Sequence, residues 1–233
     1  LLPQQGVADT RAGASGNIAA DIVAKLIAYD QTPPSVVWGS RAAFVADDVD
    51  VTFETISDQL AAARPAGFQP IRIYAADYPP GSPAASLSSA INTGSLLVNY
   101  FGHGAIQRWG TWSGGEIFNG VTVDALANGG RYPFVTVGDC LNGLFSLSDA
   151  QPSLAESWQR APDKGAVAVW APSSVGVPTS HRRLMLALYH ALFVDNLEKL
   201  GPATTAAVVD LLAAHAGYEE LTATYLLFGD PAT

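Results

Sequence analysis

The stretch LLVNYFGHGAIQRWG, residues 96–110, is a mostly apolar run that ends abruptly in Gly102-His103-Gly104. Its first part, residues 96–101, is typical of a buried strand. Histidine is an unusual residue at the end of such a strand, and the two glycines leave the backbone around it bare. His103 therefore either lies in a tight turn or is placed there for chemistry.

A second stretch, FVTVGDCLNG, residues 134–143, also passes from an apolar strand into a polar cluster between glycines. This cluster contains Cys140, the only cysteine of the chain, so an intramolecular disulfide is excluded. In an open parallel sheet, ligands bind outside the carboxyl ends of the strands. Neighbouring strands would thus bring His103 and Cys140 to one edge, as a thiol nucleophile and its general base require. The alternative is a Gly-His-Gly turn and a small buried thiol in the core.

The rest of the chain alternates between short apolar runs and helical patterns. This alternation predicts an α/β fold of three layers, with a mostly parallel central sheet flanked by helices. No repeat, low-complexity tract or linker divides the sequence, so residues 1–233 are expected to form a single domain. Strands are predicted at residues 41–46, 71–75, 95–101, 132–137 and 166–171, and helices at residues 17–29, 52–63, 83–92, 181–200 and 203–214.

The composition is that of a well-cored globular protein, with 48% hydrophobic and 14% charged residues. The net charge is −9 and no block of Lys or Arg occurs, which argues against nucleic acid or an anionic membrane as a partner. No apolar run approaches the roughly 20 residues of a membrane span. The chain starts at Leu1 without Met, so we expect a fragment or a processed form.

A third polar cluster, Asp47, Asp48 and Asp50, follows the predicted strand at residues 41–46. Three interpretations are open: a solvated loop, a calcium-binding loop, or an orienting partner for His103. The later ligands of an EF-hand loop are absent. A carboxylate on the far ring nitrogen of a histidine would fix its tautomer and support the imidazolium.

The glycines beside His103 allow a substrate carbonyl to approach the backbone closely. The N–H groups of Gly104 and Cys140 could then form an oxyanion hole, in which one donor contributes about 3 kcal/mol to lowering the barrier. The other histidines compete poorly for a catalytic role. We predict a core position for His190, a solvated position for His181, and no zinc site, because no histidine pair has ligand spacing with Cys140.

Four blocks together resemble the gingipain-type cysteine peptidases, whose catalytic domain has the caspase-like fold. They are LLVNYFGHGAIQRWG, YPFVTVGDCLNGLF, PSLAESWQRAPDKGAVAVWAPSS and YLLFGDPAT, which occur in the family's order and span about residues 96–233. Residues 17–63 also resemble the helix and strand that precede these blocks. The joint match is far more specific than either polar cluster alone.

The resemblance implies that Cys140 is the nucleophile and His103 the general base and acid. It implies that the N–H groups of Gly104 and Cys140 form the oxyanion hole. The family's third catalytic member, an acid, falls on Asp47 or Asp48, and we favour Asp47.

The resemblance also implies a substrate pocket. Asp50 is the nearest equivalent of the acid that lines the specificity pocket in relatives that cleave after arginine. Ser173 and Ser174 fall in the wall of that pocket. The substrate would be a polypeptide, no cofactor would be required, calcium could serve as a structural ion, and the protein would be secreted or attached to the bacterial surface.

The sequence departs from the family in three places. Asp139 stands where the gingipains carry a small apolar residue; it would disfavour the thiolate if it points inward, or attract a basic side chain if it lies in the pocket. Residues 175–178 lack the tryptophan that covers the pocket in arginine-specific relatives. The family's N-terminal subdomain is missing, and its Gly-Arg strand element is barely recognisable in residues 9–11.

These observations favour a cysteine endopeptidase that forms a thioester intermediate through a Cys–His dyad and cleaves after basic residues. Two alternatives stay open. In a sortase-like transpeptidase, an amine would replace water as the acceptor. In a binding or scaffold domain, the site would be catalytically dead. The sequence gives no indication of the oligomeric state.

Overall fold

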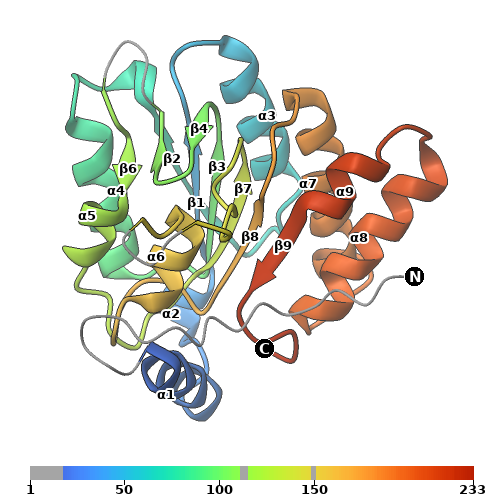
Figure 1. Cartoon of the computed structure of the whole chain (residues 1–233). Coiled ribbons are helices and arrows are strands. Elements are labelled where there is room, and N and C mark those ends of the chain that lie inside the picture. Colours follow the sequence, from blue (N-terminus) through green and yellow to red (C-terminus); the bar gives the residue numbers. More distant parts are fainter. Residues whose placement is uncertain (1–17, 111–114, 148–150) are drawn as a thin grey trace.

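A six-stranded sheet in the order β2-β1-β3-β7-β8-β9 forms the middle layer of the computed structural model, which describes residues 18–110, 115–147 and 151–233 (Figure 1). Strands β2, β1, β3, β7 and β8 are parallel, and β9 pairs with β8 in the antiparallel sense. The strands are β1 (Arg41–Ala46), β2 (Gln69–Tyr74), β3 (Leu97–Phe101), β7 (Phe134–Gly138), β8 (Ala168–Pro172) and β9 (Tyr225–Phe228).

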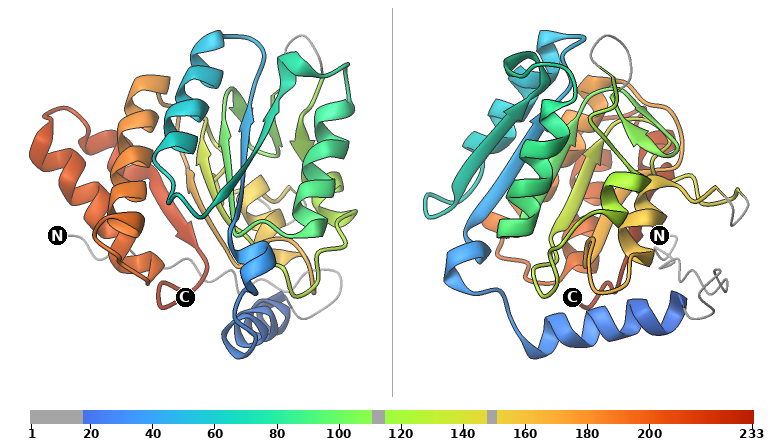
Figure 2. Two further views of the ribbon diagram at one scale, coloured as in Figure 1. Left: turned by 180° about the vertical axis from the view of Figure 1, so that it is seen from behind. Right: turned by 90° about the vertical axis from the view of Figure 1, so that its left-hand side faces the viewer.

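Helices cover both faces of this sheet (Figure 2). Successive side chains of a strand point to opposite faces, so Phe44 joins one apolar core and Val45 the other. The first core lies against α3 (Val51–Ala62), α7 (Pro178–Phe193) and α8 (Leu200–Ala214). The second lies against α4 (Ser82–Thr93), α5 (Gly120–Asp124) and α6 (Leu154–Arg160). The remaining helical elements are α1 (Ile18–Gln31), α2 (Val36–Gly39), the 3₁₀ turn η1 (Ala75–Asp77) and α9 (Glu219–Thr224).

The predicted three-layer α/β fold and its five parallel strands are confirmed. The two helices predicted at residues 181–200 and 203–214 are present, but the first, α7, ends earlier, at Phe193, and the second, α8, begins at Leu200. Asn196 adopts a left-handed conformation between them, with φ at 55°. Asparagine tolerates this conformation better than most residues, which allows the chain to turn there. The Gly-Arg element expected at residues 9–11 lies outside the described residues.

A second, smaller sheet follows His103 directly and was not predicted. It consists of β4 (Gly104–Ala105), β5 (Arg108–Trp109) and β6 (Phe118–Asn119), all antiparallel. Each strand has only two residues, which is too short for a periodic signal in the sequence. This sheet fixes the backbone of Gly104, the residue next to His103.

Candidate active site

The carboxyl ends of β3 and β7 bring two loops into direct contact. Phe101 is paired with Gly138 in the register of the two strands. An added Cβ at Gly104 would lie only 2.0 Å from Oδ2 of Asp139. The prediction that His103 and Cys140 follow neighbouring strands at one edge of the sheet is therefore confirmed.

Three hydrogen bonds fix the backbone around His103 and the turn that follows β1. Asp47 lies directly after β1, is 2% exposed, and accepts a 3.1 Å hydrogen bond on Oδ2 from the backbone N–H of His103. Its Oδ1 accepts from the N–H of Asp48 at 2.9 Å. The hydroxyl of Tyr100 donates to the His103 carbonyl at 2.6 Å. Burial raises the pKa of Asp47, and the two N–H donors oppose this effect.

The other two aspartates of the β1 turn differ from Asp47. Asp48 and Asp50 are exposed. Asp50 caps α3, because its Oδ1 accepts a 2.8 Å hydrogen bond from the N–H of Thr52. Hydrogen bonds from the side chain and the backbone of Thr52 lower the pKa of Asp50, and the charge of His103 lowers it further. Asp50 is therefore near enough to His103 to act on it electrostatically.

Cys140 lies at a sharp turn after β7. Its side chain is half-buried, and Sγ lies 3.7 Å from the carbonyl oxygen of Gly176. The next residue, Leu141, has a left-handed φ of 68°, and its N–H donates to the Ser174 carbonyl at 3.1 Å. Burial raises the pKa of the Cys140 thiol, a hydrogen bond with the Gly176 backbone opposes this, and the charge of Asp139 adds to the effect of burial.

The loop after β8 supports the Cys140 turn. Ser173 donates to the Thr224 carbonyl from both its N–H, at 2.8 Å, and its hydroxyl, at 3.0 Å. Ser174 supplies the carbonyl that accepts from Leu141. Both serines are partly exposed beside Cys140, and their predicted role in a pocket wall stays a prediction.

The prediction that Asp139 lies in an open pocket and attracts a basic side chain is wrong. Asp139 is 2% exposed and is packed against Gly104. Within the part of the chain that the structure describes, neither carboxyl oxygen has a hydrogen-bond partner. Burial raises the pKa of this carboxyl well above its usual range. The inward alternative is the correct one, and Asp139 disfavours the Cys140 thiolate.

Two other histidines differ from their predicted positions. His181 is not solvated but 1% exposed, with Nδ1 2.6 Å from the Tyr225 hydroxyl. Because that hydroxyl donates to the Val137 carbonyl at 2.9 Å, His181 must donate to it, and burial lowers the pKa of His181 to about 4. His190 is not in the core; its side chain is 62% exposed and lies 3.2 Å from Asp195.

No group of three or more His, Cys, Asp and Glu among the described residues could hold a metal ion. The predicted structural calcium therefore stays a prediction. In the same part of the chain, no helix is long and apolar enough to cross a membrane.

Two cavities border the loops around Cys140. One of about 670 Å³ lies beside α5 and α6 and is lined in part by Ala105 and Leu141, each of which directly follows a predicted oxyanion donor. The other, of about 540 Å³, lies beside α7 and α9 and is lined in part by Gly176, whose carbonyl is close to the thiol. An extended chain could thus bind across this edge of the sheet.

A methyl group at position 104 is expected to force the two loops apart. Asp139 is buried and cannot swing into solvent, so Gly104→Ala should lower the free energy of unfolding by about 1–3 kcal/mol. Urea unfolding measures this loss. Gly67→Ala is the matched control, because an added Cβ there meets nothing within 4 Å. Equal stability of the two variants would contradict the contact.

Sequence comparison assigns the chain to a family. The model of peptidase family C25 matches residues 14–233, and the chain belongs to this family. Gingipain R2 of Porphyromonas gingivalis is 38% identical over 88 residues, which cover 38% of this chain and 11% of that protein. Gingipain R1 of the same species is also 38% identical over 88 residues, or 38% of this chain and 8% of the relative.

Solved structures show the same fold. The Arg-specific cysteine proteinase gingipain R superposes with a TM-score of 0.74 at 23% identity, over 91% of this chain and 51% of that one. A structure described only as a protease gives a TM-score of 0.75 at 16% identity, over 96% of this chain and 54% of that one. The chain thus spans about half the length of these solved relatives, and the predicted caspase-like fold of the gingipains is confirmed.

Proposed function

We propose that this domain is a cysteine endopeptidase in which Cys140 is the nucleophile and His103 the general base. The observation that carries the proposal is the register of β3 and β7, which places both residues at one sheet edge and packs Gly104 against the Cys140 loop. Membership of peptidase family C25 supports the same chemistry.

In the proposed reaction, Sγ of Cys140 attacks the carbonyl carbon of a peptide bond while His103 takes the thiol proton. The negative charge that develops on the carbonyl oxygen is stabilised by the N–H groups of Gly104 and Cys140. His103 then gives its proton to the leaving amine, and a thioester remains. Water, deprotonated by His103, hydrolyses the thioester and restores the thiol.

Asp47 would act through the backbone of His103. Its carboxylate accepts a hydrogen bond from the backbone N–H of His103. This bond fixes the position of the His103 backbone, from which the imidazole extends. This is the role we assign to the third catalytic member. Asp48 is exposed in the same turn and is the alternative.

We further propose that the substrate carries a basic residue on the acyl side of the scissile bond. Asp50 is exposed and close enough to His103 for its pKa to be lowered by the histidine's charge. A relative of the same fold is described as Arg-specific. Secretion or attachment to the bacterial surface is proposed from the family resemblance alone.

One observation favours a second candidate function, a non-catalytic binding domain. Burial of the thiol raises the pKa of Cys140, and the charge of Asp139 raises it further. A peptidase thiol needs the opposite effect or a strong neighbouring base.

The test is hydrolysis of peptides with a basic residue before the scissile bond, compared between the wild type and Cys140→Ala. We expect turnover by the wild type and none by the variant. The same assay with an added amine nucleophile identifies transpeptidation by the formation of an aminolysis product. A wild type that cleaves no peptide, and whose Cys140 reacts with iodoacetamide as slowly as a buried thiol, would instead support the binding domain.

A further inference from the structure

Asn142, two residues after Cys140, connects the nucleophile loop to the β4–β5 hairpin. It is 1% exposed. Its Nδ2 donates to the carbonyls of Ala105 and, at 3.3 Å, Arg108. Its Oδ1 accepts from the indole N–H of Trp109. All three partners belong to the hairpin that begins at Gly104.

The connection continues to His103 through two aromatic rings. Trp109 stacks on Tyr100 with ring centroids 4.6 Å apart and planes inclined by 7°. The Tyr100 hydroxyl donates to the His103 carbonyl at 2.6 Å. Asn142 is therefore linked to the candidate base His103 through Trp109 and Tyr100, as well as to the hairpin.

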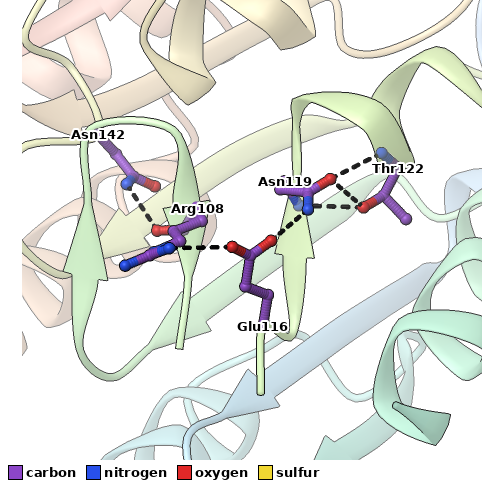
Figure 3. A network of polar contacts seen from close by, with 5 residues as sticks. All are labelled: Arg108, Glu116, Asn119, Thr122 and Asn142. Carbon is purple, nitrogen blue, oxygen red and sulfur yellow. Dashed lines mark hydrogen bonds and ion pairs between the residues drawn. The ribbon is translucent and has the colours of Figure 1, made fainter. Parts of the chain in front are cut away.

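The hairpin is also held on its far side (Figure 3). Nη1 of Arg108 lies 3.0 Å from Oε1 of Glu116, and the other oxygen of Glu116 accepts from Asn119. Asn119 in turn caps α5 and accepts from the N–H of Thr122 at 3.0 Å. Because the hairpin is anchored here, the bonds of Asn142 locate the Cys140 loop relative to a fixed body.

We propose that Asn142 is a positioning residue that sets the spacing between the N–H groups of Gly104 and Cys140. This inference rests on the proposed function, in which these two groups stabilise the oxyanion. Loss of the Asn142 side chain frees the Cys140 loop from the hairpin and misplaces one donor. Small misplacements of catalytic groups have large effects on rate.

Two reactions of the Cys140 thiol should respond differently to loss of the Asn142 side chain. Hydrolysis of a peptide passes through an oxyanion and needs both N–H donors. Alkylation by iodoacetamide is a direct displacement of iodide by sulfur, in which no oxyanion forms. A variant with misplaced donors should lose the first reaction and keep the second.

Asn128 offers a matched control. It is 0% exposed, and its Nδ2 donates to the carbonyls of Arg131 and Gly165 at 2.9 and 2.8 Å. Its Oδ1 accepts from the N–H of Gly165 at 3.0 Å. These residues precede β7 and β8, at the end of the sheet opposite Cys140. Asn128 thus has the same burial and number of hydrogen bonds, but no link to the site.

The experiment compares Asn142→Ser with Asn128→Ser in the whole domain. We expect kcat for a peptide substrate to fall about 100-fold in Asn142→Ser, with KM and the iodoacetamide rate within about threefold of the wild type. Asn128→Ser should lose comparable stability and keep kcat. Trp109→Phe, which removes the indole donor to Asn142 together with part of the ring that stacks on Tyr100, serves if Asn142→Ser does not fold, and should lower kcat about tenfold.

Two outcomes would overturn the inference alone: an unchanged kcat in a folded Asn142→Ser or Trp109→Phe variant, or a parallel fall of kcat and the iodoacetamide rate. The first result would show that the hydrogen bonds of Asn142 do not position the two N–H donors. The second would show that these hydrogen bonds only stabilise the fold. A wild type that hydrolyses no peptide would overturn this inference together with the proposed function.

Discussion

Replacement of His103 by alanine is expected to lower kcat/KM for peptide hydrolysis by about 1000-fold. Burial raises the pKa of the Cys140 thiol, so the thiol is protonated at neutral pH. A base must therefore remove the thiol proton during attack. His103 follows β3, the strand next to β7, and so lies at the same edge of the sheet as Cys140. Without the imidazole, the leaving amine also lacks its proton donor.

The measurement is the pH dependence of kcat/KM and of Cys140 alkylation in the wild type and His103→Ala. Both rates should be lower in the variant, because the base that takes the thiol proton is absent. His190→Ala is the control, because His190 is exposed and contacts only the surface carboxylate of Asp195 among the ion pairs of the described residues. An equal loss in both variants, or none in His103→Ala, would remove His103 from the mechanism.

The sequence predicted this edge of the sheet because its elements carry strong local signals. β3 and β7 are fully buried and mostly apolar; a glycine follows β3, and a glycine is the last residue of β7. Parallel strands place their carboxyl ends together whatever the rest of the fold does. His103 and Cys140 could therefore be located from the ends of their strands alone.

Other features depend on packing between distant segments and left no local signal. Asp139 is packed against Gly104 of the neighbouring loop, and Leu141 has a left-handed conformation that its residue type does not predict. The burial of His181 depends on Tyr225, 44 residues away. Asn142 is an ordinary loop residue in the sequence, and only the β4–β5 hairpin reveals its contacts. The short strands of that hairpin have no periodicity to detect.

Asp139→Asn is expected to make stability less sensitive to pH. Burial raises the pKa of Asp139 in the folded protein above the value of about 3.9 for an unfolded chain. The neutral acid's contribution to stability is therefore fully present below pH 3.9 and is lost as pH rises through the folded pKa. Within that window the wild type should lose about 1.4 kcal/mol for each pH unit relative to the variant.

Urea unfolding between pH 4 and pH 8 measures this difference. Asparagine keeps the shape of the side chain and cannot ionise, so the two proteins should differ least at the acid end. Asp210→Asn, a change at an exposed carboxylate on α8, should show the pH dependence of the wild type. Parallel stability profiles for the wild type and Asp139→Asn would mean that the pKa of this carboxyl in the folded protein is not raised above its value in the unfolded chain.

The same substitution should make the thiol more reactive. The charge of Asp139 contributes to raising the pKa of Cys140, although burial contributes more. Its removal should therefore lower the thiol pKa and increase the rate of alkylation near pH 8, where each pKa unit changes the thiolate fraction up to about tenfold. Alkylation of wild type, Asp139→Asn and Asp210→Asn across pH tests this. A thiol pKa unchanged in Asp139→Asn would show that burial alone raises it, and that Asp139 acts on the site only through its contact with Gly104.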